Sequence, residues 1–175
     1  MREKDLYKPV SKWLRRFLKE KHPNWEVKAL DSSQVYLSNL IFDLGLTEHF
    51  PEYKAYEIKV DVVGFAISGK RASLTLVECK SARIGLKDIS QLLGYSIVAK
   101  PECSFIVSPQ GMSSAVSYLL QDLKKYDILK YSKGKLIRVC RWDVRKKDIV
   151  RPTTPPIPLL PATRRDAPRR RCPPC

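Results

Sequence analysis

The stretch that decides the fold is YEIKVDVVGFAISGKRASLTLVECK, residues 56–80, near the middle of the chain. Residues 56–67 and 72–79 are rich in β-branched and aromatic side chains, which favour extended strands. Between them, SGKR at 68–71 carries the glycine and polar residues of a tight turn. The stretch therefore predicts a β-hairpin.

The flanking segments carry the periodicities of further helices and strands. Apolar side chains recur every three or four residues in a helix that faces a core, and alternate in a half-buried strand. No such pattern decides residues 31–50. The predicted order is α-β-β-β-α-β-α-β, an α/β sandwich with a central mixed sheet. Its elements outside the hairpin are helices over 5–20, 86–99 and 112–125, and strands over 25–30, 104–107 and 135–142.

The composition divides the chain into two parts. Residues 1–148 carry the predicted elements and form the expected folded domain. Residues 149–175 are expected to form a flexible basic tail, because they hold eight of the thirteen prolines and bury too little apolar surface to fold alone. Cys172 and Cys175 in this tail have metal-ligand spacing, but we expect an exposed chain end.

The net charge of +15 is spread over both parts. Residues 151–175 hold six arginines and one aspartate, a net charge of +5, which leaves +10 for residues 1–150. A folded body this basic favours a polyanionic partner, most often nucleic acid. The alternative is that lysine and arginine only solubilise the surface.

The N-terminal segment and the cysteine count bear on the compartment. The chain starts without an apolar signal segment, and no apolar run approaches the length that spans a bilayer, so we expect a cytoplasmic protein with no membrane contact. Five cysteines without a secretion signal argue against a disulfide framework. The two histidines lack the spacing of a zinc site.

Three polar residues of the central hairpin stand out chemically. Asp61 falls within the apolar run IKVDVV, and Glu78 and Lys80 end the next strand. Residues i and i+2 of a strand share a face, so Glu78 and Lys80 project together, and strand pairing can bring Asp61 beside them. Two carboxylates, with the Cys79 backbone carbonyl as a third oxygen, suit Mg²⁺ or Mn²⁺.

A lysine next to such a metal has a chemical role in phosphodiester hydrolysis. It can orient or deprotonate the attacking water, or stabilise the charged transition state. A buried aspartate in an apolar strand is costly unless it is paired or binds a metal. The alternative is an edge strand on which Asp61 faces water, with Glu78 and Lys80 as an ordinary surface pair.

Asp61 followed after sixteen residues by Glu78-Cys79-Lys80 resembles the signature of the PD-(D/E)XK nucleases. The resemblance covers residues 3–110 and implies a restriction-endonuclease-like α/β/α sandwich. Val60 stands where the motif has a proline. Members with an iron–sulfur cluster place a cysteine ahead of the motif; none precedes Asp61 here, so no cluster is expected.

The resemblance also implies three further site residues. The family often places a glutamate on its first helix, and Glu3 is the matching candidate. Gln91 and Tyr95 resemble the Gln-xxx-Tyr motif of RecB-like and lambda-type exonucleases. As i and i+4 neighbours on a helix, they can together hold a DNA phosphate or the catalytic residues.

The sequence thus supports a metal-dependent deoxyribonuclease, and the superfamily suggests a possible homodimer. The rival hypothesis is a non-catalytic module on the same fold that binds nucleic acid or docks a partner protein through the proline-rich tail. The choice between endonuclease and exonuclease, and between DNA and RNA, stays open.

Overall fold

The computed structural model describes residues 1–150. The predicted tail from residue 151 onward, with Cys172 and Cys175, lies outside the described residues. The sheet extends two residues beyond the predicted end of the domain at 148, because Asp148–Val150 forms a last strand, β8, that pairs with the strand before it.

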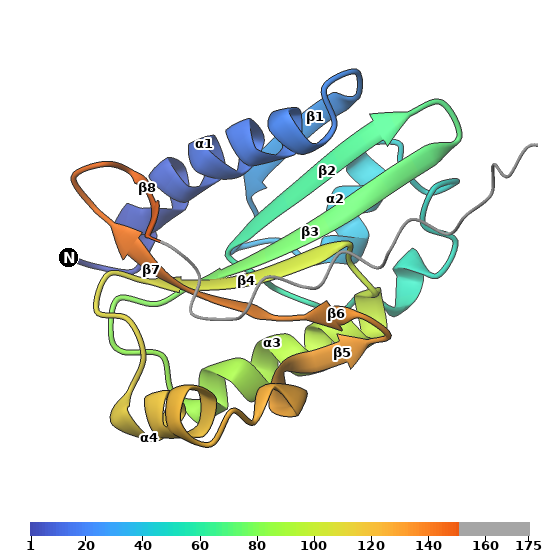
Figure 1. Cartoon of the computed structure of the whole chain (residues 1–175). Coiled ribbons are helices and arrows are strands. Elements are labelled where there is room, and N and C mark those ends of the chain that lie inside the picture. The colour runs from blue at the N-terminus through green and yellow to red at the C-terminus, as the bar shows by residue number, and fades with distance from the viewer. Residues whose placement is uncertain (151–175) are drawn as a thin grey trace, which may run out of the picture.

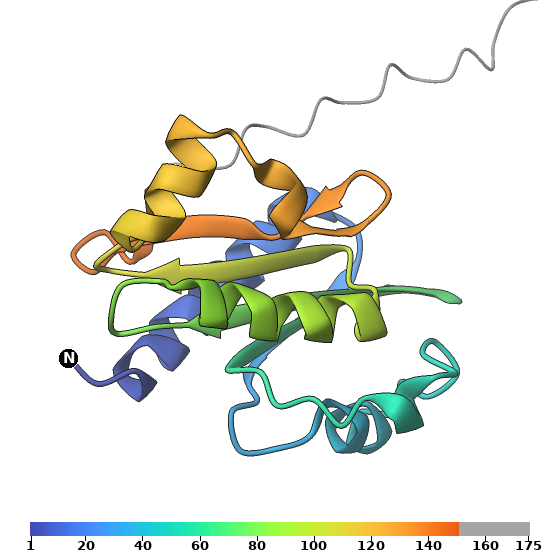
Figure 2. The same ribbon diagram turned by 90° about the horizontal axis from the view of Figure 1, so that it is seen from below.

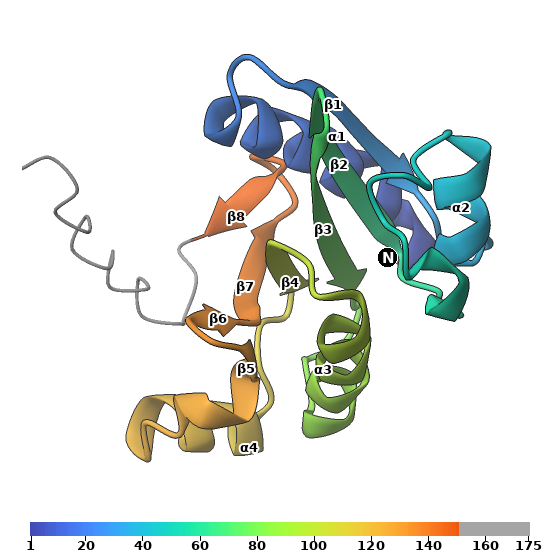
Figure 3. The same cartoon turned by 90° about the vertical axis from the view of Figure 1, so that its right-hand side faces the viewer.

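The core of the molecule is a six-stranded mixed sheet with the order β1-β2-β3-β4-β7-β8 (Figure 1). The β3–β4 and β4–β7 pairs are parallel and the other neighbours are antiparallel. Figure 3 shows the sheet curling between its two edges. Its strands other than β8 are β1 (Glu26–Asp31), β2 (Val62–Ser68), β3 (Arg71–Cys79), β4 (Cys103–Ser108) and β7 (Arg138–Asp143).

Helices cover both faces of this sheet, which is compatible with the predicted α/β sandwich (Figure 2). On one face, α1 (Lys4–Lys21) packs its apolar side against β1 and β2. The approach is close at Gly64, where a Cβ atom would lie 2.6 Å from a Leu18 methyl group. The other face is covered by α2 (Leu37–Asp43), α3 (Leu86–Ala99) and α4 (Ser114–Ser117).

The predicted hairpin forms, but its first strand is shorter than expected. Residues 56–61 are not paired as a strand, and β2 begins at Val62. The backbone carbonyls of Tyr56 and Ile58 instead accept hydrogen bonds from Ser38 and Leu37. The first turn of a helix has amide groups without partners inside the helix. The Tyr56 and Ile58 carbonyls supply hydrogen-bond acceptors for two of these amides in α2.

Other differences lie in the segments with weak patterns. Residues 31–50 contain α2, and the helix predicted over 112–125 is α4 followed by a π-helical turn, η2 (Tyr118–Asp122). The strand predicted over 135–142 is split into β6 and β7. The small elements are two 3-10 turns, η1 (Tyr53–Ala55) and η3 (Tyr126–Leu129), and the two-stranded sheet β5 (Lys130–Ser132) and β6 (Lys135–Leu136).

Candidate active site

Asp61 and Glu78 lie at the end of the β2–β3 pair. The register pairs Val62 with Val77 and Val63 with Leu76, so its continuation by one position places Asp61 opposite Glu78. Asp61 lies just before β2, not inside a strand as the sequence pattern indicated. Its side chain turns to the end of β3, where Oδ2 accepts a hydrogen bond of 2.8 Å from the Cys79 amide.

Glu78 and Lys80 project to the same side, as the strand periodicity predicted. The Lys80 Nζ atom lies 2.9 Å from Glu78 Oε1. Glu78 is only 4% exposed, and its second oxygen, Oε2, is buried without a hydrogen-bond partner among residues 1–150. An unsatisfied carboxylate oxygen is costly in a protein interior, so this atom is the strongest indication of a missing ligand.

Burial is the largest influence on the pKa values of these groups. It raises the pKa of Glu78 to about 7, helped by the neighbouring Asp61 carboxylate and opposed by the Lys80 ammonium. Burial also raises the pKa of Asp61, against the stabilising bond from the Cys79 amide. For Lys80, burial disfavours the ammonium, but the Glu78 carboxylate outweighs it and raises the pKa. Lys80 therefore stays charged at neutral pH.

The N-terminal end of α1 brings Glu3 and Tyr7 to the site. Figure 1 shows α1 beginning at the end of the sheet where β3 finishes, and Glu3 Oε1 lies 3.8 Å from Lys80 Nζ. Such a long, partly exposed pair contributes little stability. Tyr7, one turn further along α1, contacts the Asp61 carboxylate; burial, followed by this contact, raises the pKa of the Tyr7 hydroxyl.

Sequence reasoning missed Tyr7, although a signal for it was present. Glu3 and Tyr7 are i and i+4 residues and therefore share one side of α1. The same spacing that directs Glu3 to Lys80 directs Tyr7 to Asp61. A phenol that hydrogen-bonds the carboxylate favours its ionised form, which is the form that binds a cation.

Gln91 and Tyr95 are neighbours on α3, as predicted, but the structure does not join them to the carboxylates. Gln91 Nε2 lies 3.4 Å from the Tyr95 hydroxyl, in an exposed position. Among residues 1–150, neither side chain makes a hydrogen bond to Asp61, Glu78 or Lys80. Their role in the site stays a prediction.

The donors at this site fit a hard divalent cation such as Mg²⁺. In the described part of the chain no three acidic, histidine or cysteine side chains converge on one point. The Cys79 amide faces Asp61, and in a strand the carbonyl of a residue points to the same neighbour as its amide. Asp61, Glu78 and the Cys79 carbonyl therefore present an all-oxygen set.

A groove of about 540 Å³ lies beside this set, between the start of α1 and the loop after β1. Glu3 and Tyr7 form part of its wall, so it adjoins both the lysine and the aspartate of the site. Its other lining residues are Arg2, Lys4, Asp31, Ser33 and Gln34. The groove thus carries both cationic and acidic side chains beside the carboxylates of the site.

Comparison with protein-family models, curated proteins and solved structures finds no match to this chain. In residues 1–150 no helix is both long enough and apolar enough to cross a membrane.

Proposed function

We propose that this protein is a Mg²⁺- or Mn²⁺-dependent deoxyribonuclease with a restriction-endonuclease-like fold, a member of the PD-(D/E)XK superfamily. The observation that carries the proposal is the buried pair of carboxylates at a strand end, beside the charged Lys80 and with Glu78 Oε2 unpartnered. The mixed sheet with helices on both faces supports the fold.

Asp61, Glu78 and the Cys79 carbonyl would hold the cation. Bound there, it supplies positive charge that polarises the scissile phosphate and favours attack by water. Within the chain, the Cys79 amide and Tyr7 hold Asp61 in place and favour its ionised form against the effect of burial. Glu78 is already desolvated, so it gains a partner when a cation arrives instead of losing water.

Lys80 acts on the water and on the developing charge. Because Lys80 is an ammonium ion in this arrangement, it donates hydrogen bonds; it does not accept a proton. It would orient the attacking water and offset negative charge on the phosphate as the new P–O bond forms and the bond to the leaving oxygen breaks. The proton released by the attacking water passes to bulk water, and the leaving oxygen takes up a proton from bulk water. Glu3 lies 3.8 Å from the same ammonium group.

A cleavage panel tests this proposal. Labelled single-stranded, duplex and branched DNA and matching RNA are incubated with the full chain in Mg²⁺, in Mn²⁺ and in excess EDTA. Cleavage should require one of the two metals. The Glu78→Gln variant should lose cleavage but keep DNA binding, while Glu20→Gln, an exposed glutamate on α1, should behave as wild type.

The panel also separates the rival function and the substrate classes. DNA binding without cleavage under any metal condition would identify a non-catalytic binding module and refute the enzyme proposal. Preferential cleavage of RNA would correct the substrate. Light scattering on the same samples, with and without DNA, tests the predicted homodimer.

A further inference from the structure

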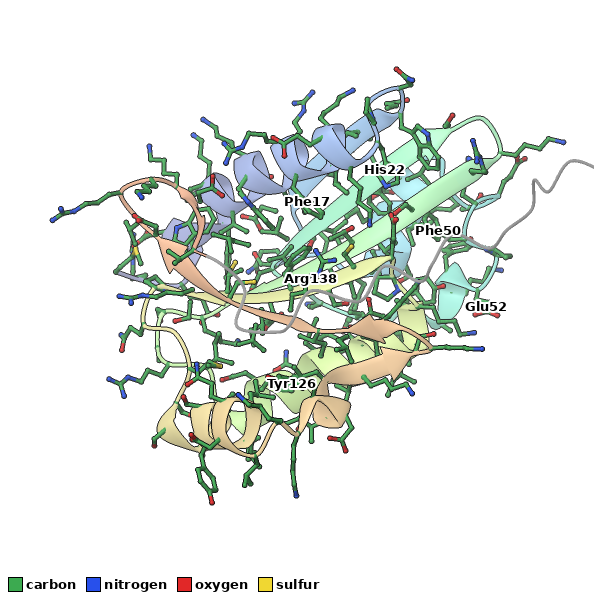
Figure 4. All side chains as sticks on the ribbon, viewed as in Figure 1. Phe17, His22, Phe50, Glu52, Tyr126 and Arg138 are labelled. Atoms are coloured by element: carbon green, nitrogen blue, oxygen red, sulfur yellow. The ribbon has the colours of Figure 1, made fainter. Side chains whose placement is uncertain are left out.

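A second groove, of about 520 Å³, lies at the end of the sheet opposite the candidate active site. His22 and Phe50, labelled in Figure 4, belong to its wall. Arg71 starts β3 at this groove and Cys79 ends β3 at the candidate site. At about 3.3 Å per residue, the two sites are roughly 26 Å apart. We name this the distal groove.

The distal groove is strongly cationic. Its charged and imidazole lining groups are Lys70, Arg71, Lys100, Lys135, His22 and His49. The only carboxylate in its described lining is Glu102. A concave surface with one sign of charge concentrates ligands of the opposite sign.

Glu102 does not neutralise these cations, because it is already paired. Glu102 is bonded to Lys21 at 2.8 Å and to His22 at 2.9 Å, and it accepts a hydrogen bond from Ser73. Burial works against the charged form, but these bonds lower the pKa of Glu102 to about 2. The carboxylate is therefore saturated. Lys100 lies 3.8 Å from Glu52, whereas Lys70, Arg71 and Lys135 form no ion pair within residues 1–150.

Two of those cations are held in place by uncharged groups. The Arg71 guanidinium lies over the Trp25 ring, 5.2 Å from its centroid, and Lys135 Nζ donates a hydrogen bond of 2.9 Å to the Pro101 carbonyl. Neither side chain forms an ion pair within residues 1–150. Cations that are fixed in position but unpaired bind an anion at a lower entropy cost.

His49 is fixed in the wall of the distal groove. Its Nε2 donates to the Gly69 carbonyl at 2.9 Å. Because Nε2 carries the proton in this bond, Nδ1 is an acceptor and does not bond a phosphate oxygen. His49 therefore shapes the groove, and the cationic groups Arg71 and Lys135 carry the affinity for an anion.

We propose that the distal groove is a second binding site, specific for phosphate groups. A guanidinium fork with several ammonium groups matches the multiple oxygens of phosphate. The phosphates could belong to a nucleic-acid strand or to a small phosphorylated molecule, and the chemistry is the same. The proposal goes beyond the nuclease proposal and does not depend on cleavage.

The three tryptophans of the chain allow a direct test by NMR. The indole N–H signal of Trp25 reports on the distal groove, and those of Trp13 and Trp142, buried in the core on the α1 face, are internal controls. The full chain, without divalent metal, is titrated separately with pyrophosphate and with a short single-stranded oligonucleotide. The Trp25 signal should shift saturably while the other two stay unchanged.

Charge-matched variants then locate the contact. The double variant Arg71→Gln/Lys135→Gln should weaken the Trp25 response about tenfold or more, the loss expected for two charge-assisted hydrogen bonds. The double variant Arg15→Gln/Lys12→Gln removes the same charge from the exposed side of α1 and should leave the response unchanged.

Each outcome decides the proposal. A saturable response to pyrophosphate supports a site for small phosphorylated molecules, and a response to the oligonucleotide alone supports a nucleic-acid contact. The proposal is overturned by no saturable shift with either probe, by equal losses in the two double variants, or by an equal response to a glutamate-rich peptide. Because no cleavage is measured, failure of the nuclease proposal leaves this test unaffected.

Discussion

Replacing Glu78 with glutamine should stabilise the metal-free protein while it removes cleavage. Glu78 is 4% exposed, carries one oxygen without a partner among residues 1–150, and lies opposite the Asp61 carboxylate. An ionised group in that position destabilises the folded chain. The amide keeps the shape of the side chain and removes the charge.

The size of the effect follows from the raised pKa. The pKa of Glu78 rises from its ordinary 4.5 to about 7, so its contribution to stability is fully present below pH 4.5 and is lost as the pH rises through 7. At neutral pH the cost is about 3 kcal/mol. This cost already includes the attraction of Lys80, which lowers the pKa of Glu78, so Glu78→Gln should gain about 3 kcal/mol, or roughly 6–12 °C in melting temperature.

Thermal melting in EDTA, above and below this pH range, measures the gain. Glu78→Gln should melt higher than wild type above pH 7 and equally below pH 4.5, with Glu20→Gln as the control at an exposed glutamate. Added Mg²⁺ should raise the melting temperature of wild type but not of Glu78→Gln. A variant that melts below wild type at high pH, or a gap that does not change with pH, would refute the reasoning.

Three shorter predictions concern other residues. Lys80→Arg should slow single-turnover cleavage about tenfold or more because the planar guanidinium has a different geometry; a normal rate would show that only charge matters. Because the pKa of Glu102 is lowered to about 2, its stabilisation is present above pH 4.5 and lost as the pH falls through 2. In urea unfolding, wild type should lose about 1–2 kcal/mol more than Glu102→Gln over that range; parallel losses would contradict this. Asp61→Ala should cost about 1–3 kcal/mol because it leaves the buried Cys79 amide without an acceptor, whereas Asp61→Asn keeps one; equal melting of the two variants would exclude that bond as the cause.

The elements that sequence reasoning predicted well are those with a strong local pattern. The turn of the hairpin, β3 and α3 match their predictions closely, because turn residues and apolar periodicity act within a short stretch. The pairing of Glu78 with Lys80 followed from strand periodicity alone. These features follow from patterns within short stretches of the sequence.

The missed features depend on neighbours that are distant in sequence. Residues 56–61 have the composition of a strand, but the Tyr56 and Ile58 carbonyls accept hydrogen bonds from amides at the start of α2. The sequence of α2 itself carries no clear pattern. β8 is three residues long and exists through its pairing with β7. Gln91 and Tyr95 matched a motif, yet their exposed contact is with each other. Sequence spacing does not reveal which side chains meet across the sheet.

The start of β2 at Val62, rather than earlier in the chain, explains how the candidate site arises. Continuing the register would place the Val60 carbonyl opposite the Cys79 amide, but Val60 accepts a hydrogen bond from the Ser32 hydroxyl instead, at 2.6 Å. Ser32 also donates its amide to the Asp61 carbonyl. The Cys79 amide is thereby free for the Asp61 carboxylate, and the Cys79 carbonyl on the same side lacks its regular strand partner. Ser32 thus holds the chain away from the strand ladder next to Asp61, Glu78 and the Cys79 carbonyl, which together form the proposed cation site.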